Sequence, residues 1–261
     1  MTERLRVATW NVNSLTARMP RVEEWLSTVR PDVLCLQETK QADAAFPYGV
    51  FESLGYEAAH HGDGRWNGVA IVSKVGLEGV ISGFGTELDA EGTRLIAATC
   101  GGVRVHSVYV PNGRSLDSEH FTAKLAWLAG LRDLLADRHH PSDPLVVCGD
   151  FNVAPDDRDV WDPTQFEGMT HVSPPERAAL GALLDWGLVD VFRSCYGDGG
   201  LFSWWDYRGG SFHQGRGMRI DLVLATRPLA DGVSFALVDR NARKGEKPSD
   251  HAPVLADLAI D

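Results

Sequence analysis

The chain has 261 residues, 44% of them hydrophobic, and a formal net charge of −11 at pH 7, which suits one globular domain spanning residues 1–261. The acidic balance argues against a protein that coats nucleic acid by charge alone, but not against an enzyme that acts on a polyanion through a local basic rim and a bound cation. No stretch reaches the length of a membrane helix, about 18 apolar residues, and no secretory signal opens the sequence, so we expect a cytoplasmic protein with no membrane partner.

The first third of the chain predicts a strand, a helix and a second strand. Residues 5–12 alternate between apolar and polar types and are rich in strand formers, which predicts the first strand. Apolar residues then recur at helical spacing, which predicts a helix with Pro20 in its first turn that ends at Pro31. A short apolar run at 33–36 predicts a buried strand, and residues 56–77 predict short strands joined by glycine-rich turns.

The middle of the chain predicts a hairpin, a long helix and a central strand. Residues 95–100 and 103–109 form the hairpin around a Gly-Gly pair, and an apolar stripe predicts the helix over 118–139. The run 145–148 is apolar and rich in β-branched residues, so it predicts a fully buried strand.

The last third predicts a helix from Pro174 to Trp186 and then short strands. These strands are expected at 202–207, 220–225, 233–238 and 254–258. Both halves of the chain show a strand, helix, strand order in which polar residues follow the strands. This order predicts an α/β fold with two similar halves that meet at one cleft.

Polar side chains stand at the ends of the predicted strands, and in α/β proteins functional sites lie at such ends. These residues are Asn11, Asn13, Glu38, Tyr109, Asp150, Asn152, Asp221, Asp250 and His251. If the strand ends converge, the cluster is rich in carboxylate and amide oxygens and poor in Cys and His, which suits Mg²⁺ rather than structural zinc. A Mg²⁺ ion beside Asp, His and amide groups can catalyse the hydrolysis of a phosphate ester.

Each of these residues alone also has an ordinary structural explanation. Asp150 and Asn152 follow a strand as turn-forming residues do, and a single Glu38 is more often a solvated charge. His251 precedes a strand, where a histidine is more often structural than catalytic, but Asp221 offers the carboxylate partner that a catalytic imidazole needs. The aromatic stretch at 202–207 suits either a core or a base-stacking surface.

Five short motifs, taken together, resemble the exonuclease III family of AP endonucleases, within the endonuclease/exonuclease/phosphatase superfamily. They are Trp10-Asn11-Val12-Asn13, Leu36-Gln37-Glu38-Thr39-Lys40, Gly149-Asp150-Phe151-Asn152, Arg219-Ile220-Asp221 and Ser249-Asp250-His251. They stand in the family's order and cover nearly the whole chain. The resemblance implies a four-layer α/β/β/α sandwich, in which two mixed sheets pack face to face, helices lie outside and loops at one end form the site.

The resemblance also implies roles for individual residues. Glu38 matches the principal Mg²⁺ ligand, with Asn13 and Asp250 beside it, and Mn²⁺ is expected to substitute. Asp150 matches the acid/base residue, which either activates water or protonates the leaving group. The phosphate-contacting set matches Asn11, Tyr109, Asn152 and His251, with Asp221 as the partner of His251. Trp204, Met218 and Ile220 match a pocket for a flipped-out, base-less sugar, and Trp205 and Arg114 lie where relatives insert side chains into DNA. A basic rim is expected from Lys40, Arg65, Arg208, Arg216, Arg243, Lys244 and Lys247.

The function implied by the resemblance is that of a monomeric Mg²⁺-dependent DNA-repair nuclease. Its expected substrate is double-stranded DNA, cut 5′ to abasic sites or cleared of blocked 3′ ends, with 3′–5′ exonuclease activity as a further expectation. Two alternatives stay open. One is a phosphoesterase of the same fold that acts on lipid or inositol phosphates, and the other is an inactive relative that only binds DNA.

Overall fold

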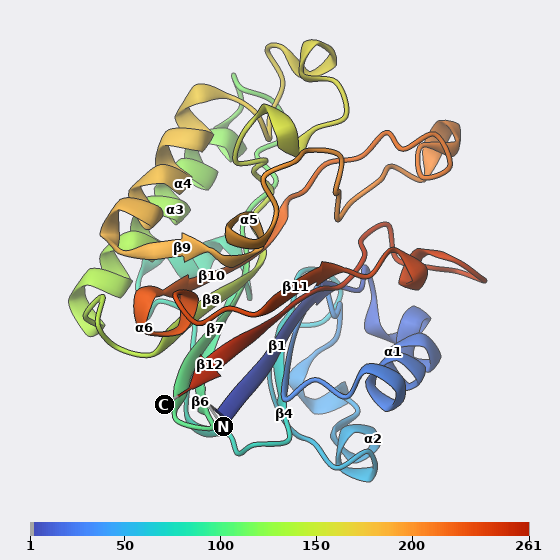
Figure 1. Cartoon of the computed structure of the whole chain (residues 1–261), viewed down its shortest axis with the longest axis vertical. Helices are drawn as coiled ribbons and strands as arrows, with labels where there is room; N and C mark the ends of the chain where they lie inside the picture. The colour runs from blue at the N-terminus through green and yellow to red at the C-terminus, as the bar shows by residue number, and fades with distance from the viewer. Residues whose placement is uncertain (1–2, 261) are drawn as a thin grey trace.

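The computed structural model describes residues 3–260, and over this range two six-stranded sheets pack face to face with helices on both outer faces (Figure 1). The first sheet has the order β11-β12-β1-β2-β4-β3, with β1 (Glu3–Asn11), β2 (Val33–Gln37), β3 (Glu57–His61), β4 (Val69–Ser73), β11 (Phe235–Val238) and β12 (Val254–Ile260). The second has the order β5-β6-β7-β8-β10-β9, with β5 (Glu78–Ser82), β6 (Leu95–Cys100), β7 (Val103–Tyr109), β8 (Leu145–Asp150), β9 (Leu188–Asp190) and β10 (Asp221–Thr226). The predicted four-layer sandwich is confirmed.

The helices form the two outer layers of the sandwich. On the side of the first sheet lie α1 (Leu15–Val29) and α2 (Tyr48–Ser53), and on the side of the second lie α3 (Glu119–Arg138) and α4 (Pro174–Trp186). Shorter helices are α5 (Val191–Cys195), α6 (Arg227–Ala230) and single 3₁₀ turns at Asp43–Ala45, Glu87–Glu91, Asp157–Asp159, Pro163–Phe166, Arg208–Gly210 and Arg240–Arg243. Within residues 3–260, no helix combines the length and apolar character needed to cross a membrane.

The two sheets share one plan, as the strand–helix–strand order predicted. Each has a parallel pair at its centre, β1 with β2 and β7 with β8, and the strands of each pair are joined through α1 or α3. Two strands flank the parallel pair on either side, and their pairings are antiparallel. Asn11 ends β1 and Asp150 ends β8, and their side chains are hydrogen-bonded, so the carboxyl ends of both parallel pairs lie at the same end of the sandwich.

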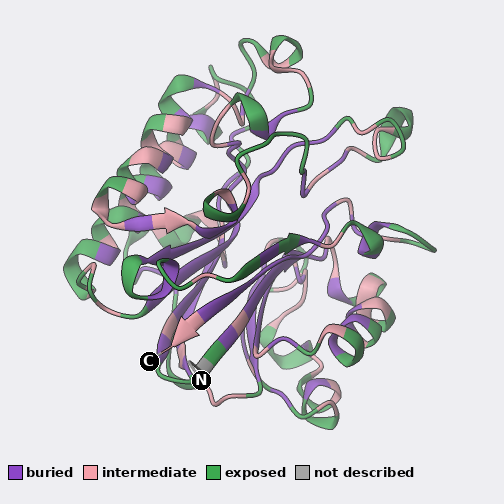
Figure 2. Cartoon of the chain, viewed as in Figure 1, coloured by how far each residue is buried: buried purple, intermediate pink, exposed green. Residues whose placement is uncertain are grey.

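Alternation along the strands decides which side chains face the space between the sheets. Val7 and Cys148 lie in the core between the sheets, and even steps along each strand, four residues in β1 and two in β8, lead to Asn11 and Asp150 on the same face. Asp221 is paired directly with Asp150 across β10 and β8. Buried residues fill this inner layer (Figure 2). The polar strand ends therefore lie at one end of an apolar core.

Two of the predicted elements are wrong in detail. The first helix begins at Leu15, so Pro20 lies inside it rather than in its first turn, because Leu15 already belongs to the buried face. Residues 202–207 form no strand: Trp204 bonds to Met218, while Trp205 N donates to Asp250 O. Because successive residues pair with different segments, no continuous ladder forms.

Candidate active site

Asn11 joins the ends of the two sheets. Its Nδ2 atom donates to Glu38 Oε1 at 2.9 Å and to Asp150 Oδ2 at 2.9 Å, so one amide contacts a carboxylate from each half of the chain. Its Oδ1 accepts from Asn13 N at 3.0 Å, which fixes the direction of the amide. Asn11 and Asp150 are buried, while Glu38 is partly exposed, so the cluster opens to solvent on the Glu38 side.

His251 lies between two carboxylates. Its Nδ1 atom is 2.8 Å from Asp221 Oδ2, and its Nε2 atom is 3.8 Å from Asp150 Oδ2. Ser203 Oγ donates to Asp221 Oδ2 at 2.7 Å and accepts from Asp221 N, which holds that carboxylate in place. Burial lowers the pKa of His251, but the charges of Asp221 and Asp150 outweigh it and raise the pKa to about 10. The ring is therefore an imidazolium at neutral pH.

Asp150 titrates near neutrality. Burial raises its pKa to about 7, and the charge of Asp221 adds to the rise. The charge of His251 and the hydrogen bonds from Asn11 Nδ2 and Asn152 N act in the opposite direction. A carboxyl group with such a pKa exchanges protons readily at physiological pH.

Glu38 sits on a backbone segment with unusual torsion angles. Glu38 and Lys40 have φ values of 51° and 53°, and Thr39 between them is fully buried. Thr39 Oγ1 is 2.8 Å from His60 Nε2, and His60 Nδ1 is 2.8 Å from Asp43 Oδ1. This chain of contacts holds the segment 38–40, which otherwise favours an extended conformation.

The ammonium group of Lys40 lies among the oxygen atoms next to Glu38. Lys40 Nζ is 2.9 Å from Glu38 Oε2 and donates to Asn13 Oδ1 at 2.6 Å. Asn13 Nδ2 donates to Asp250 Oδ1 at 3.0 Å, and Trp204 Nε1 donates to Asp250 Oδ2 at 3.1 Å. Both oxygens of Asp250 are thus engaged by neutral donors, and Asp250 orients Asn13.

The donor atoms near Glu38 fit a hard divalent cation. Ligand atoms of Glu38, Asp150 and His251 all lie within 4.8 Å of one another. Because the His251 ring is cationic and bonded to Asp221, the atoms left for a metal are oxygens, which Mg²⁺ prefers. Of the three predicted ligands, Glu38 belongs to this group, and Asn13 and Asp250 stand beside it through the contacts described above.

Tyr109 and Asn152 also lie at this end of the second sheet. Burial raises the pKa of Tyr109, and the charges of Glu38 and Asp150 raise it further, so its phenol keeps its proton. Asn152 Nδ2 donates to Val110 O at 2.9 Å. Both side chains therefore present hydrogen-bond donors at neutral pH.

Sequence reasoning missed a buried ion pair behind Asn152. Lys124 and Glu176 are fully buried and bonded to each other, and Lys124 Nζ also donates to Asn152 O at 2.7 Å and Asn112 O at 3.3 Å. Glu176 Oε1 accepts from His171 N at 2.9 Å. The signal was present in the sequence, because Lys124 falls on the apolar stripe of its helix.

His171 and Asn112 were also missed, and they complete the surroundings of Asn152. His171 Nε2 is 3.1 Å from Asn152 Oδ1, and Asn112 Nδ2 donates to the same oxygen at 3.2 Å. His171 has a φ of 77° and a pKa lowered to about 4, chiefly by burial, so it is neutral at physiological pH. No local pattern marks either residue, since they meet Asn152 only in the folded chain.

Three of the predicted DNA-contacting residues pack together beside the polar cluster. Met218 and Ile220 are buried in a small apolar group with Val160, and Trp204 packs against it. Arg114 is exposed on the loop after β7.

Trp205 corrects a prediction. It is 1% exposed, lies in the core between the sheets and packs edge-on against Phe212, with their ring centroids 5.1 Å apart. Arg240 and Arg243 stack over its ring. A side chain buried in this way does not insert into DNA, so Trp205 is a core residue.

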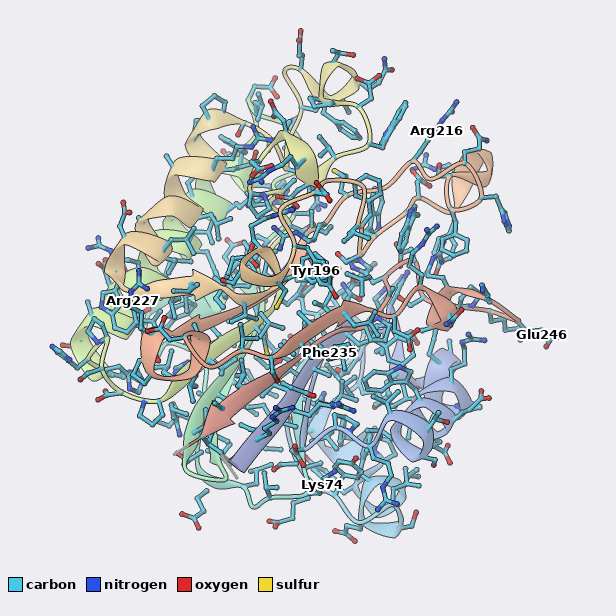
Figure 3. The ribbon with its side chains drawn as sticks, viewed as in Figure 1. Lys74, Tyr196, Arg216, Arg227, Phe235 and Glu246 are labelled. Carbon is cyan, nitrogen blue, oxygen red and sulfur yellow. The ribbon has the colours of Figure 1, made fainter. Side chains whose placement is uncertain are left out.

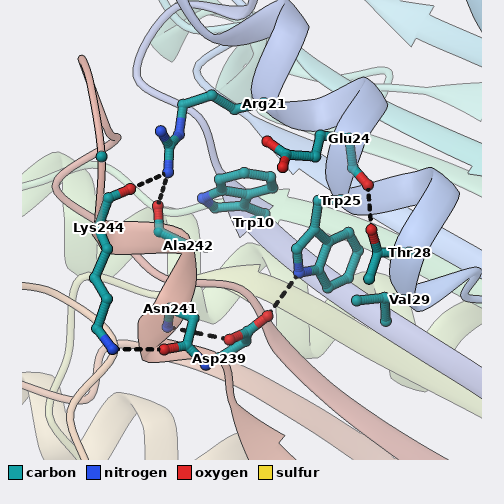
Figure 4. A pocket seen from close by; sticks show the side chains of 11 residues that line it. Trp10, Arg21, Glu24, Trp25, Thr28, Val29, Asp239, Asn241, Ala242 and Lys244 are labelled. Atoms are coloured by element: carbon teal, nitrogen blue, oxygen red, sulfur yellow. Dashed lines mark hydrogen bonds between the residues drawn. The ribbon is translucent and has the colours of Figure 1, made fainter.

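A cavity of about 460 Å³ lies away from the polar cluster, between α1 and the 3₁₀ turn at 240–243 (Figure 4). Arg21 closes it by donating to the backbone oxygens of Ala242 and Lys244, and Trp25 Nε1 donates to Asp239 Oδ2 at 2.9 Å. Trp10 forms one wall and donates to the backbone oxygen of His251. The cavity therefore lies behind the site, and Trp10 in its lining contacts the His251 segment.

Residues 8–251, which include every residue of this polar cluster, match the Endonuclease/Exonuclease/phosphatase family, and the chain belongs to that family. Exodeoxyribonuclease III of Haemophilus influenzae is 36% identical over 269 aligned residues, which cover 97% of this chain and 100% of that protein. An AP endonuclease from Archaeoglobus fulgidus has the same fold, with a TM-score of 0.95 and 38% identity over 98% of this chain and 100% of that one. The 3′–5′ exonuclease NExo from Neisseria meningitidis also has this fold, with a TM-score of 0.94 and 40% sequence identity over 98% of this chain and 100% of that one.

These likenesses confirm the resemblance stated from the motifs. The chain is a phosphodiester hydrolase of the exodeoxyribonuclease III and AP endonuclease type, from a family of metal-dependent enzymes. Its relatives act on DNA, and a Neisseria 3′ phosphatase of this fold is known with a product DNA hairpin bound.

Proposed function

We propose that this protein is a Mg²⁺-dependent DNA-repair phosphodiesterase that cuts 5′ to abasic sites and clears blocked 3′ ends. The observation that carries the proposal is the contact of Asn11 with both Glu38 and Asp150, next to the Asp221–His251 pair. This arrangement supplies a proton-exchanging carboxyl group, a fixed cationic donor and an oxygen-rich cation site within one cluster. An inactive relative would have no need to keep all three.

The residues divide the reaction between them. Hydrolysis forms a bond from a water oxygen to phosphorus and breaks the bond to the leaving oxygen, so one proton leaves the water and one reaches the leaving group. Asp150, with its pKa of about 7, carries one of these transfers. His251 donates from Nε2 to a phosphate oxygen while Asp221 fixes the ring, and Asn11, Tyr109 and Asn152 add neutral donors.

The cation site would be held chiefly by Glu38, with Asp150 facing it and Asn13 placed by Asp250. When bound, Mg²⁺ would supply charge stabilisation at the phosphate. Mn²⁺, which also prefers oxygen ligands, is expected to substitute. The cation and the substrate would reach the cluster from the Glu38 side, because Glu38 is its partly exposed member.

The apolar group of Trp204, Met218 and Ile220 is the proposed sugar pocket. A sugar without a base has an apolar face and needs no room for a base. A compact apolar pocket beside the phosphate site therefore accepts it, and not an intact nucleotide, once it has left the duplex. Arg114 lies on the neighbouring loop and is proposed as a DNA contact.

A second candidate is 3′-end processing as the main activity, with little cutting at internal abasic sites. It is favoured by the Neisseria relative, whose name states 3′–5′ exonuclease activity and which is as similar to this chain as the Archaeoglobus AP endonuclease is. The two candidates use the same cluster and differ only in how DNA reaches it.

The decisive test is cleavage of a labelled duplex with one tetrahydrofuran abasic analogue, beside an undamaged duplex and one with a 3′-phosphate, in Mg²⁺ and in EDTA. Incision at the analogue that needs Mg²⁺ supports the first candidate. Shortening or dephosphorylation only at 3′ ends supports the second. Failure to act on any of the three duplexes would reject both and direct attention to lipid or inositol phosphates.

Site variants test the assigned chemistry. Asp150→Asn removes proton exchange and His251→Ala removes the cationic donor, so we expect each to lower kcat by about 100-fold or more while DNA binding persists. Asp137→Asn on the exposed end of α3 is the matched control and should cleave like the wild type. Unchanged cleavage by both site variants would show that the cluster is not the active site.

A further inference from the structure

Trp161 and Arg216 form a stacked pair on the surface, and Arg216 is one of the residues expected in the basic rim. The guanidinium carbon of Arg216 lies 5.2 Å from the centroid of the Trp161 ring. Trp161 is 36% exposed, and Arg216 is exposed and reaches away from the sandwich at its loop end (Figure 3). Within residues 3–260, no carboxylate lies within ion-pair distance of Arg216.

The pair stands directly beside the apolar group next to the active site. Val160 and Met218 form a backbone bridge, and Trp161 N donates to Gly217 O at 3.0 Å. Val160 and Met218 belong to the apolar group proposed as the sugar pocket, and Trp161 and Arg216 lie one and two residues away along the same two segments. Trp161 directly follows Val160, and Arg216 precedes Met218 with Gly217 between them, so the pair lies at the rim of that group.

The two segments are held rigidly. Arg219 is fully buried, and its Nε donates to Asp159 Oδ1 at 2.6 Å while its backbone N donates to Asp159 O at 2.8 Å. Arg193 also bonds to the same buried carboxylate. This anchor lies two residues before Trp161 and three residues after Arg216, so the exposed pair rests on a fixed base and loses little freedom on binding a ligand.

We propose that Trp161 and Arg216 form a stacking platform for a nucleobase of the DNA strand next to the target nucleotide, with Arg216 also facing its phosphate. The inference rests on the proposed function and extends it to residues that the family motifs do not include. An exposed indole offers a flat surface to any base, and a guanidinium without a carboxylate partner is free to meet phosphate. The expected ligand is therefore DNA of any sequence.

The test is the affinity for two fluorescein-labelled duplexes, one with a tetrahydrofuran abasic analogue and one undamaged, measured in EDTA so that neither is cut. Stacking of one base typically gives a change of about 5- to 100-fold on alanine substitution, so Trp161→Ala should weaken binding within that range. Trp161→Phe keeps an aromatic face and should bind within about threefold of the wild type. Arg216→Ala should weaken binding and reduce the salt dependence by about one phosphate contact.

The matched control is Phe235→Ala on β11. Phe235 is 37% exposed and Arg6 stacks over it at 5.9 Å, so it is a comparable pair away from the loop end, and its loss should leave DNA affinity unchanged (Figure 3). If the wild type binds the abasic duplex while Trp161→Ala and Arg216→Ala bind it equally well, the platform is refuted and the proposed function stands. If the wild type binds neither duplex, both are refuted.

Discussion

His251 shows how neighbours can reverse the effect of burial on a single residue. A buried imidazole alone would be neutral, yet Asp221 and Asp150 raise its pKa to about 10. Asp150 is shifted in the same direction for a different reason, since burial disfavours its charge. One group is thus held protonated while the other titrates near neutrality, which is the division of roles that acid/base chemistry at a phosphate requires.

The charged state of His251 predicts how stability depends on pH in the metal-free protein. Its folded pKa of about 10 exceeds the ordinary value of 6.5, so the stability it contributes is complete below pH 6.5 and is lost as pH rises through 10. We expect the free energy of unfolding to fall by up to about 1.4 kcal/mol per pH unit in this window. Asp221→Asn lowers the pKa of His251 and should flatten that slope. Denaturant unfolding in EDTA measures it, and equal slopes in both proteins would contradict the assigned ion pair.

Trp205 and Trp161 differ in burial, and this predicts opposite costs of truncation. Trp205 is 1% exposed, so Trp205→Ala should lower the free energy of unfolding by about 3–5 kcal/mol through the cavity it leaves. Trp161→Ala removes a surface side chain and should change it by no more than about 0.5 kcal/mol. Urea unfolding compares the two. Similar losses would mean that Trp161 is part of the core and not a platform.

Among the structural elements, the segment 38–40 holds the proposed metal ligand Glu38 on a strained backbone. Two of its three residues have positive φ, and Thr39 between them is fixed by His60 from β3 and through it by Asp43. Strained backbone of this kind persists only where the surroundings hold it. The position of Glu38 therefore depends on β3, two strands away in the sheet, as well as on β2, which ends just before it.

This dependence gives a prediction for Thr39→Val, which keeps the shape and removes the hydroxyl contact with His60. We expect Mg²⁺ affinity to fall by about 10-fold, because supporting contacts orient metal ligands. The shift of Tm on adding Mg²⁺ measures this without an activity assay. Thr28→Val is the matched control, since its hydroxyl donates to Glu24 O within α1, and it should bind Mg²⁺ like the wild type. If Mg²⁺ shifts the Tm of Thr39→Val as much as that of the wild type, the position of Glu38 does not depend on the His60 contact.

Across the whole molecule, the site is an assembly of distant segments. Asn11 and Asp150 are 139 positions apart and meet because each ends one strand of the central parallel pair of its own sheet. The outer helix layer takes part as well, because Lys124 of α3 and Glu176 of α4 bond to each other beneath the loops that carry Asn112 and Asn152. The sandwich thus supports the site from the core side and from the helix side.

The buried ion pair predicts a large cost when one partner is removed. Glu176→Gln leaves the Lys124 charge buried and without its carboxylate, so we expect a loss of about 3–5 kcal/mol in the free energy of unfolding. Adding Lys124→Met removes the second charge and should recover at least about 1 kcal/mol. Chemical denaturation of the two single variants and the double variant completes the cycle. Additive losses would mean that the pair is not coupled.

Most of the strands, the main helices and the polar strand ends could be read from the sequence, because each depends on the pattern of near neighbours, whereas the short strands β5 and β9 were not predicted. Alternating residues in β1 and the apolar run of β8 already indicate two buried strands that end at Asn11 and Asp150. The five motifs named the family for the same reason, since each is a short contiguous stretch around one strand end. Their convergence was an inference from the carboxyl-end rule for α/β folds.

The contacts between segments could be decided only by packing in three dimensions. Trp204 and Trp205 are neighbours of the same type, and no local pattern shows that one faces the apolar group near Met218 while the other is buried against Phe212. Likewise, His171 meets Asn152 through a loop with no periodic pattern. Such contacts join residues far apart in the chain, so their geometry follows from how the sheets and loops pack and not from the propensity of any one stretch.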